Sequence, residues 1–237
     1  MNAPELIVAL DVPSFERANR VLDALAGLSL IYKVGLEAFC AYGDEIRREL
    51  ERRNQTYFLD LKLNDIPNTV AGAIRSLVRP GARIIDVMAL GGNEMMQTAV
   101  AVAQERAAEL GIDPPEIFAV TVLTSIAPED LRELGLTGGP GENAIRLAAL
   151  ARDARCSGVI CSPQEVRDLK SFFGTEFKTL TPGIRPAESP LADQKRVMTP
   201  RDARDAGSDY IVVGRPILES NDMRAAAEAI LADLVPV

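Results

Sequence analysis

Short apolar runs alternate with longer amphipathic stretches along the chain. The apolar runs have the length and the β-branched composition of buried strands. They cover residues 6–11, 31–35, 56–62, 83–90, 116–123, 158–162, 177–184 and 210–217. Between them, apolar residues recur at helical spacing, as at Val70, Ile74 and Leu77. This alternation predicts a parallel sheet whose strands are connected by helices that cover it.

The number of β-α units favours a closed sheet over an open one. Eight units in 237 residues predict a (β/α)8 TIM barrel that forms a single domain over residues 1–237. An open, doubly wound sheet is the alternative, but no G-x-G-x-x-G motif follows the first strand. The longest irregular stretches, 134–144 and 185–196, are rich in Gly and Pro and follow strands, where such barrels keep their active sites.

Composition narrows the classes of partner. The chain carries 34 acidic and 26 basic residues, a net charge of −8, and no basic stripe, so nucleic acid and acidic membranes are poor partners.

Its cysteines, Cys40, Cys156 and Cys161, lack metal-site spacing and predict reduced thiols in a cytosolic protein. Glu5 and Asp11 stand where a signal peptide would be apolar, and no apolar run approaches membrane-spanning length.

The chain contains no histidine. This absence excludes catalysis by a Ser-His-Asp triad, because the triad needs imidazole as its general base. It also excludes the usual zinc hydrolases, whose metal is held by histidine side chains.

The stretch FLDLKLNDIP places charges in a strand that otherwise has a core composition. Burying an unpaired charge costs several kcal/mol. Asp60 and Lys62 are two residues apart, so we expect them to project together, with Leu59 and Leu61 packing on the opposite face. A paired acid and amine on one face of a buried strand indicate a functional site.

Further polar residues stand at the ends of other strands. Asp11 closes the first strand and Lys33 lies late in the second. Asp65 follows the third strand, where it or Asn64 is expected to cap a helix that begins near Pro67. Each residue alone would be interpreted as a solvated strand end or a helix cap. Their convergence on one mouth of a barrel predicts a charged active site.

The last two strands end in motifs suited to an anion. TPGIR (181–185) and VVGRP (212–216) occupy the positions from which barrels of this type commonly bind phosphate. Gly183 and Gly214 would let backbone N–H groups approach the ligand, and Arg215 would bind phosphate oxygens. Either motif alone is compatible with ordinary turns, but together they predict a phosphate site.

These motifs, in their order along the chain, resemble those of a known family. FLDLKLNDIPNTV, with LIVALD, YKVG, VTVLTS, TPGIRP, DQKRVMTP and VVGRPI, is similar to the bacterial type of the orotidine 5'-phosphate decarboxylase family from the first strand to the last helix. The resemblance implies conversion of orotidine 5'-monophosphate to UMP and CO2, the last step of de novo UMP biosynthesis. It further implies a homodimer, with no cofactor and no metal.

The resemblance also implies roles for particular residues. Lys62 matches the family's proton donor, Asp60 and Asp65 match the acids of its charged array, and Lys33 completes the alternation of charges. Asp65 and Thr69 match residues that reach into the partner subunit's site.

Other positions match contacts to the nucleotide. Asp11 and Lys33 match residues that hold the ribose, and Thr124 matches a contact to the pyrimidine. The matches to phosphate contacts and to the loop that closes over the ligand are Arg185, Gln194, Gly214 and Arg215.

The implied reaction explains why the strand carries charge. Loss of CO2 leaves a carbanion on a pyrimidine ring carbon, and a lysine ammonium at ~4 Å with an effective dielectric of ~20 is worth about 4 kcal/mol. We expect Lys62 to stabilise this carbanion and then to protonate it. Asp60 would repel the departing carboxylate in the ground state.

Two other interpretations stay open at this point. The first is a Mg²⁺-dependent sugar-phosphate decarboxylase or aldolase of the same superfamily, which would carry a glutamate where this chain has Lys33, a poor metal ligand. The second is a barrel that binds nucleotides without catalysis. An intact array of Asp60, Lys62 and Asp65 argues against it, because a pure binder has no use for such charges.

Overall fold

The sheet closes on itself. The computed structural model describes residues 3–186 and 198–235. Its strands pair in parallel in sequence order, and β8 returns to β1. The strands are β1 (Glu5–Ala9), β2 (Ile31–Gly35), β3 (Thr56–Leu63), β4 (Ala82–Met88), β5 (Glu116–Val120), β6 (Gly158–Ile160), β7 (Lys178–Thr181) and β8 (Tyr210–Val213). The predicted (β/α)8 barrel is confirmed, and the open sheet is wrong.

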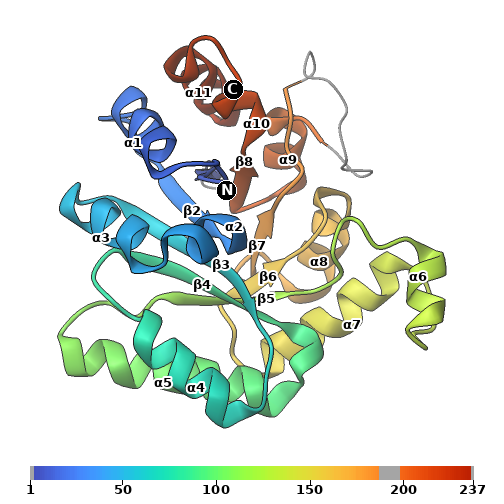
Figure 1. Ribbon diagram of the computed structural model, residues 1–237. Helices are drawn as coiled ribbons and strands as arrows, with labels where there is room; N and C mark the ends of the chain where they lie inside the picture. Colours follow the sequence, from blue (N-terminus) through green and yellow to red (C-terminus); the bar gives the residue numbers. More distant parts are fainter. Residues whose placement is uncertain (1–2, 187–197, 236–237) are drawn as a thin grey trace.

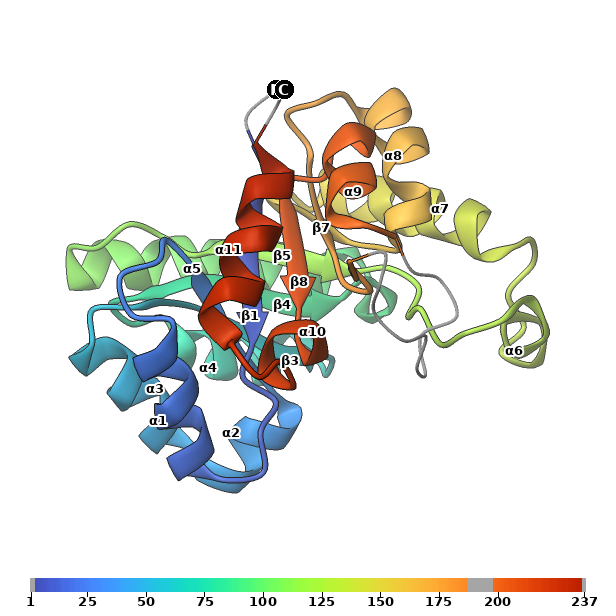
Figure 2. The same cartoon turned by 90° about the horizontal axis from the view of Figure 1, so that it is seen from above.

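Helices surround the barrel on its outer side (Figures 1 and 2). They are α1 (Phe15–Ala24), α2 (Leu36–Tyr42), α3 (Asp44–Arg52), α4 (Pro67–Leu77), α5 (Asn93–Leu110), α6 (Pro128–Glu133), α7 (Pro140–Asp153), α8 (Val166–Phe173), α9 (Pro200–Ala206), α10 (Arg215–Leu218) and α11 (Met223–Leu234). Two 3-10 turns, η1 (Ala89–Gly91) and η2 (Pro163–Glu165), complete the described elements. Within residues 3–186 and 198–235, every helix is too short or too polar to cross a membrane.

Alternation along each strand produces two apolar layers. Ile7, Phe58 and Phe118 belong to the cluster that fills the barrel, whereas Val8 and Leu59 belong to the larger cluster between barrel and helices. Successive strand residues face opposite sides, so a strand buried on both sides is apolar almost throughout. The near-continuous apolar runs in the sequence have this physical cause.

Several strands are shorter than the apolar runs predict. β5 ends at Val120, β7 at Thr181 and β8 at Val213, before the predicted ends at 123, 184 and 217. Beyond these points the apolar residues belong to loops or to the next helix, because α10 begins at Arg215. The stretch 134–144 is also partly helical, since α7 begins at Pro140.

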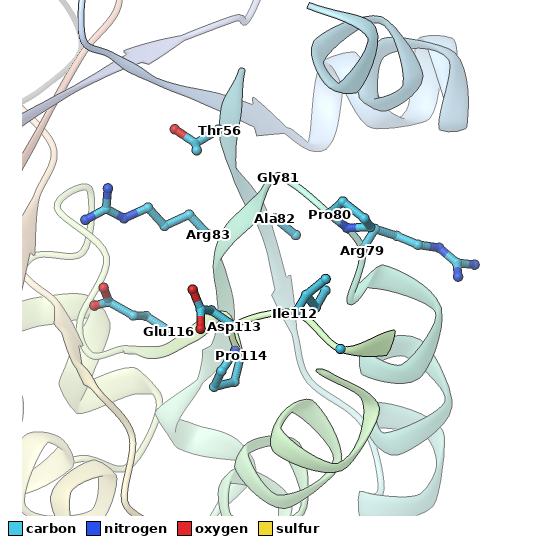
Figure 3. Close-up of a pocket in the computed structure, with 11 residues that line it drawn as sticks. Thr56, Arg79, Pro80, Gly81, Ala82, Arg83, Ile112, Asp113, Pro114 and Glu116 are labelled. Atoms are coloured by element: carbon cyan, nitrogen blue, oxygen red, sulfur yellow. The ribbon is translucent and has the colours of Figure 1, made fainter. Parts of the chain in front are cut away.

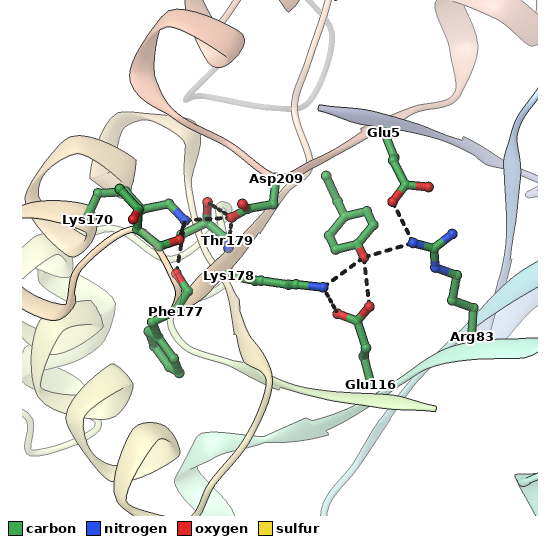
Figure 4. Close-up of polar contacts among 10 residues, drawn as sticks. Glu5, Arg83, Glu116, Lys170, Phe177, Lys178, Thr179 and Asp209 are labelled. Carbon is green, nitrogen blue, oxygen red and sulfur yellow. Dashed lines mark hydrogen bonds and ion pairs between the residues drawn. The ribbon is translucent and has the colours of Figure 1, made fainter. Parts of the chain in front are cut away.

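Polar contacts close the N-terminal end of the barrel (Figure 4). The Tyr210 hydroxyl donates to Glu116 Oε1 at 2.9 Å, and Lys178 Nζ lies 2.9 Å from Glu116 Oε2. Arg83 pairs with Glu5 at 2.5 Å beside the same tyrosine. These contacts satisfy one another's charges and join β1, β4, β5, β7 and β8, so they are structural.

Candidate active site

The site begins with an irregularity at the end of β3. Pairing with β4 shifts between Leu59 and Leu63, and Lys62 adopts a φ of +49°. A positive φ is uncommon for a residue other than glycine and identifies a constrained backbone. Asp60 and Lys62 project together and Leu61 packs against the outer cluster, as predicted, but this results from a distorted strand end and not from regular alternation.

An alternating array of charges crosses the first three strands. Lys33 Nζ on β2 lies 2.9 Å from Asp11 Oδ2 and 3.1 Å from Asp60 Oδ2. The other oxygen of Asp60 pairs with the Lys62 ammonium. A side chain at Gly35 would meet both Asp11 and Lys33 at 2.7 Å, so the close approach of these groups requires glycine there.

The charges of this array support one another. Burial alone would raise the pKa of Asp60, but Lys33 and Lys62 outweigh it and lower that pKa to about 2. Burial alone would lower the pKa of Lys33, but Asp60 and Asp11 more than compensate and raise it. At neutral pH Asp60 is therefore an anion and Lys33 a cation, although Lys33 is only 7% exposed.

A cavity of 210 Å³ opens beside the array at the C-terminal ends of the strands. Lys33, Asp60 and Lys62 line one part of it. The apolar lining includes Phe58, Val120, Ile160, Leu180 and Val212. Thr124 and Ser125 also line it, so the predicted pyrimidine contact lies within reach of the charges. Apolar walls with charges in one part suit a flat ring that carries one reactive charged group.

Asp65 and Thr69 are not part of this array in the single chain. Both are exposed, and Asp65 forms no ion pair with Lys62. Asp65 Oδ1 accepts a hydrogen bond from the Ile66 N–H at 2.6 Å. Helix α4 begins at Pro67 as predicted, but Ile66 is its N-cap residue, so the predicted side-chain cap is wrong. One oxygen of the exposed Asp65 carboxylate makes this short local bond, and the side chain does not cap the helix.

Three of the predicted phosphate residues, Arg185, Gly214 and Arg215, lie at the same end of the barrel, after β7 and β8. Arg185 is 8% exposed, and its backbone N–H donates to the Met198 carbonyl at 2.9 Å. The Met198 N–H donates to the Gly183 carbonyl at 3.2 Å, so the chain on both sides of 187–197 is held together. Gln194, the predicted loop contact, lies outside the described residues.

The second predicted phosphate element follows β8. Gly214 is the N-cap residue of α10, and Arg215 is its first residue and is exposed. A Cβ on Gly214 would lie 3.5 Å from the Ala9 side chain, an ordinary contact. Gly214 therefore lies beside Ala9 of β1, the strand after which Asp11 stands.

Sequence reasoning missed one charged residue near the array. Asp86 on β4 is completely buried and points into the barrel, two residues beyond Ile84 of the interior cluster. The signal was a single acid inside the apolar run RIIDVMAL. An acid in such a run requires a specific partner.

A larger hollow of 780 Å³ lies at the opposite, N-terminal end of the barrel (Figure 3). Its lining mixes charges of both signs, with Arg79, Arg83, Asp113 and Glu116 around it. Arg83 and Glu116 belong to the structural contacts at this end. No set of three or more potential metal-ligating side chains comes together in the described parts of the chain. The array and its cavity are therefore the candidate active site.

Comparisons with known proteins identify the family of this chain. A sequence model of the Orotidine 5'-phosphate decarboxylase / HUMPS family matches residues 4–230. The chain is similar to the orotidine 5'-phosphate decarboxylase of Moorella thermoacetica, with 47% identity over 97% of this chain and 92% of that protein. It is 45% identical to the enzyme of the same name from Idiomarina loihiensis over 99% of both chains.

A solved structure is similar over the same length. The crystal structure of orotidine 5'-phosphate decarboxylase from Lactobacillus acidophilus superposes with a TM-score of 0.88 at 38% identity, covering 99% of this chain and 100% of the other. The agreement covers the barrel and the segments that carry the array. The chain therefore belongs to the Orotidine 5'-phosphate decarboxylase / HUMPS family.

Proposed function

We propose that this protein is a carbon-carbon lyase that decarboxylates orotidine 5'-monophosphate to UMP and CO2, the last step of de novo UMP biosynthesis, without a cofactor. The observation that carries the proposal is the buried array of Lys33, Asp60 and Lys62 beside an apolar cavity. The family membership and the names of its relatives support the same reaction.

Lys62 provides the cation that the reaction needs. The bond between the ring carbon and the carboxylate breaks, and its electron pair stays on the carbon as CO2 leaves. The Lys62 ammonium stabilises this developing charge and donates its proton to the carbon, which gives UMP. A preorganised cation in a site shielded from water stabilises the transition state more than water does. The amine then recovers its proton from solvent.

Asp60 orients Lys62 and faces the departing group. Its carboxylate stays ionised because two lysines pair with it. An anion beside the substrate carboxylate is repulsive, and this repulsion falls as neutral CO2 forms. The Lys33 ammonium keeps the Asp60 carboxylate in place from the other side.

The nucleotide would bind along the mouth of the barrel. Asp11 and Lys33 hold the ribose, and Thr124 contacts the pyrimidine. The phosphate binds to the residues that follow β7 and β8, namely Arg185, Gln194, Gly214 and Arg215. Binding energy at the phosphate, distant from the reacting carbon, stabilises the closed site in which the reaction occurs.

A homodimer completes the site. Asp65 and Thr69 are exposed in the single chain, where they are available to a partner. Leu36, Ile66 and Leu90 are 53%, 66% and 52% exposed, and each closely follows one of the neighbouring strands β2, β3 and β4. Exposed large apolar side chains around a barrel mouth suit an interface between two copies. Asp65 of each subunit then adds a carboxylate to the other's array.

The test is a continuous ultraviolet assay with orotidine 5'-monophosphate after treatment with a chelator. The intact protein should consume the substrate without added metal. Lys62→Ala should fold and bind UMP but lose nearly all turnover, because it lacks both the cation and the proton. Lys178→Ala, which removes a paired lysine at the opposite end of the barrel, is the matched control and should stay active.

Three results would contradict the proposal. Substantial turnover by Lys62→Ala would exclude its role as proton donor. Activity that requires Mg²⁺ would favour a metal-dependent relative, although Lys33 occupies the position that a metal-ligating acid would need. UMP binding without turnover by the intact protein would favour a nucleotide-binding barrel.

A further inference from the structure

Asp86 is a buried acid that the proposed mechanism does not use. Its side chain is 0% exposed and lies inside the barrel on β4. Oδ1 accepts hydrogen bonds from the Leu61 N–H at 2.9 Å and the Lys62 N–H at 2.8 Å. Within the described residues, Oδ2 is buried and accepts no hydrogen bond. An orphaned carboxylate oxygen in a barrel interior requires an explanation.

The two hydrogen bonds hold the irregular end of β3. They reach the segment in which pairing with β4 shifts and Lys62 has a φ of +49°. Because the amides of Leu61 and Lys62 point to one carboxylate oxygen, they do not follow the regular ladder of a parallel sheet. Asp86 thereby holds the backbone from which the Lys62 side chain leaves the strand.

A second acid, Asp60, lies near the Asp86 carboxyl group. Asp60 is close enough for its charge to act on the buried Asp86 carboxyl. Two neighbouring carboxyl groups disfavour double ionisation, so one of them tends to keep its proton. Asp60 is already paired with Lys33 and Lys62. On the other side of Asp86, β5 presents the uncharged Phe118. Burial, followed by the charge of Asp60, raises the pKa of Asp86 well above its usual value.

We propose that Asp86 is a positioning residue for the decarboxylation: a neutral carboxylic acid that fixes the Lys62 backbone through Oδ1 and donates its Oδ2 proton to Asp60. The inference rests on the proposed function. The donated hydrogen bond stabilises the Asp60 anion and aims it at both lysines. An ionised Asp86 would instead add a second anion beside Asp60 and compete with it for the Lys62 ammonium.

Two substitutions separate the hydrogen bonds from the volume of the side chain. Asp86→Asn keeps an acceptor for the two amides and replaces the O–H donor by N–H donors. Asp86→Leu has a similar volume and neither function. We expect Asp86→Leu to lower kcat by about 10²-fold, the effect of a displacement of ~1 Å, with a smaller change in UMP affinity. Asp86→Asn should recover most of that loss.

The pH dependence and the infrared spectrum test the proton directly. Turnover of the intact protein should fall at high pH as Asp86 ionises. The pH profile of Asp86→Asn should lack this fall, because its side chain cannot ionise. At neutral pH, the intact protein should show the C=O stretch of a protonated carboxylic acid, and Asp86→Asn should lack that band. The Asn variant and the infrared band decide the question even where Asp86→Leu does not fold.

Failure of this inference differs from failure of the proposed function. An active intact protein without the protonated-carboxyl band, or an Asn variant as impaired as the Leu variant, would overturn the role of Asp86 alone. An intact protein that shows the band but has no turnover would overturn the proposed function, and with it the catalytic role, while leaving the proton on Asp86.

Discussion

Lys33→Met removes the central cation of the array while keeping an apolar stem of similar length. The Lys33 side chain is 9% exposed, and its Nζ contacts Asp60 at 3.1 Å and Asp11 at 2.9 Å. The substitution removes one of the two lysines paired with Asp60, whose side chain is 14% exposed, and leaves Lys62 as its cationic partner. We expect the variant to be less stable than the natural protein at neutral pH.

The size of the expected loss of stability follows from the burial of the ion pair between Lys33 and Asp60. Removing one partner of a buried ion pair costs about 3–5 kcal/mol. The lower end applies because Asp60 keeps Lys62 and the Asp11 side chain is 39% exposed. A loss of about 3 kcal/mol corresponds to a fall in Tm of roughly 6–12 °C in a protein of this size.

The pKa of Asp60 gives a second measure of what its ion pairs contribute to stability. Its pKa is lowered to about 2 in the folded state, chiefly because the two lysines outweigh the effect of burial. Against an unfolded value of about 3.9, this shift contributes roughly 2–3 kcal/mol to the free energy of unfolding. A carboxyl with a lowered pKa stabilises the fold above the unfolded pKa, and the contribution is lost as pH falls toward 2. The cost of Lys33→Met should therefore be largest above about pH 4.

Unfolding by heat and by denaturant should be measured at about pH 7 and pH 3 for the natural protein, Lys33→Met, Asp60→Asn and the double variant. The double variant should be more stable at neutral pH than Lys33→Met, because it no longer buries an undercompensated carboxylate. A Lys33→Met protein as stable as the natural one, or equally destabilised at both pH values, would refute the electrostatic reasoning.

Two further predictions concern the scaffold. Gly158→Ala would place a Cβ 2.1 Å from the Lys178 carbonyl oxygen and should lower the free energy of unfolding by about 1–3 kcal/mol or more. In Gly72→Ala, the control, the added Cβ would have no neighbouring atom within 4 Å. This substitution should stabilise helix α4 by about 0.5–1 kcal/mol. Thermal unfolding of the two variants checks this, and equal Tm values would contradict it. Tyr210→Phe removes the hydrogen bond to Glu116 and should cost about 1 kcal/mol in denaturant unfolding while kcat stays unchanged. A large loss of kcat would show that the N-terminal end of the barrel acts on the site.

The pattern of apolar residues was sufficient to predict the barrel architecture. A strand buried on both faces is recognisable locally, so the order of strands and helices, and hence the barrel, could be predicted from residue spacing. Strand ends were less predictable, as the premature end of β8 before Arg215 illustrates. Apolar residues continue past each strand because the following loop or helix also packs on the core.

For the site, the sequence by itself determined that four charged residues meet at one mouth of the barrel. Asp11, Lys33, Asp60 and Lys62 stand at the ends of consecutive strands, and parallel strands bring such ends to one mouth. Only the tertiary structure decided how they are held. Asp86, more than 20 residues from Lys62 along the chain, supports the array through hydrogen bonds across two strands. Such a contact depends on strand register and on the direction of single amides, which residue spacing does not encode.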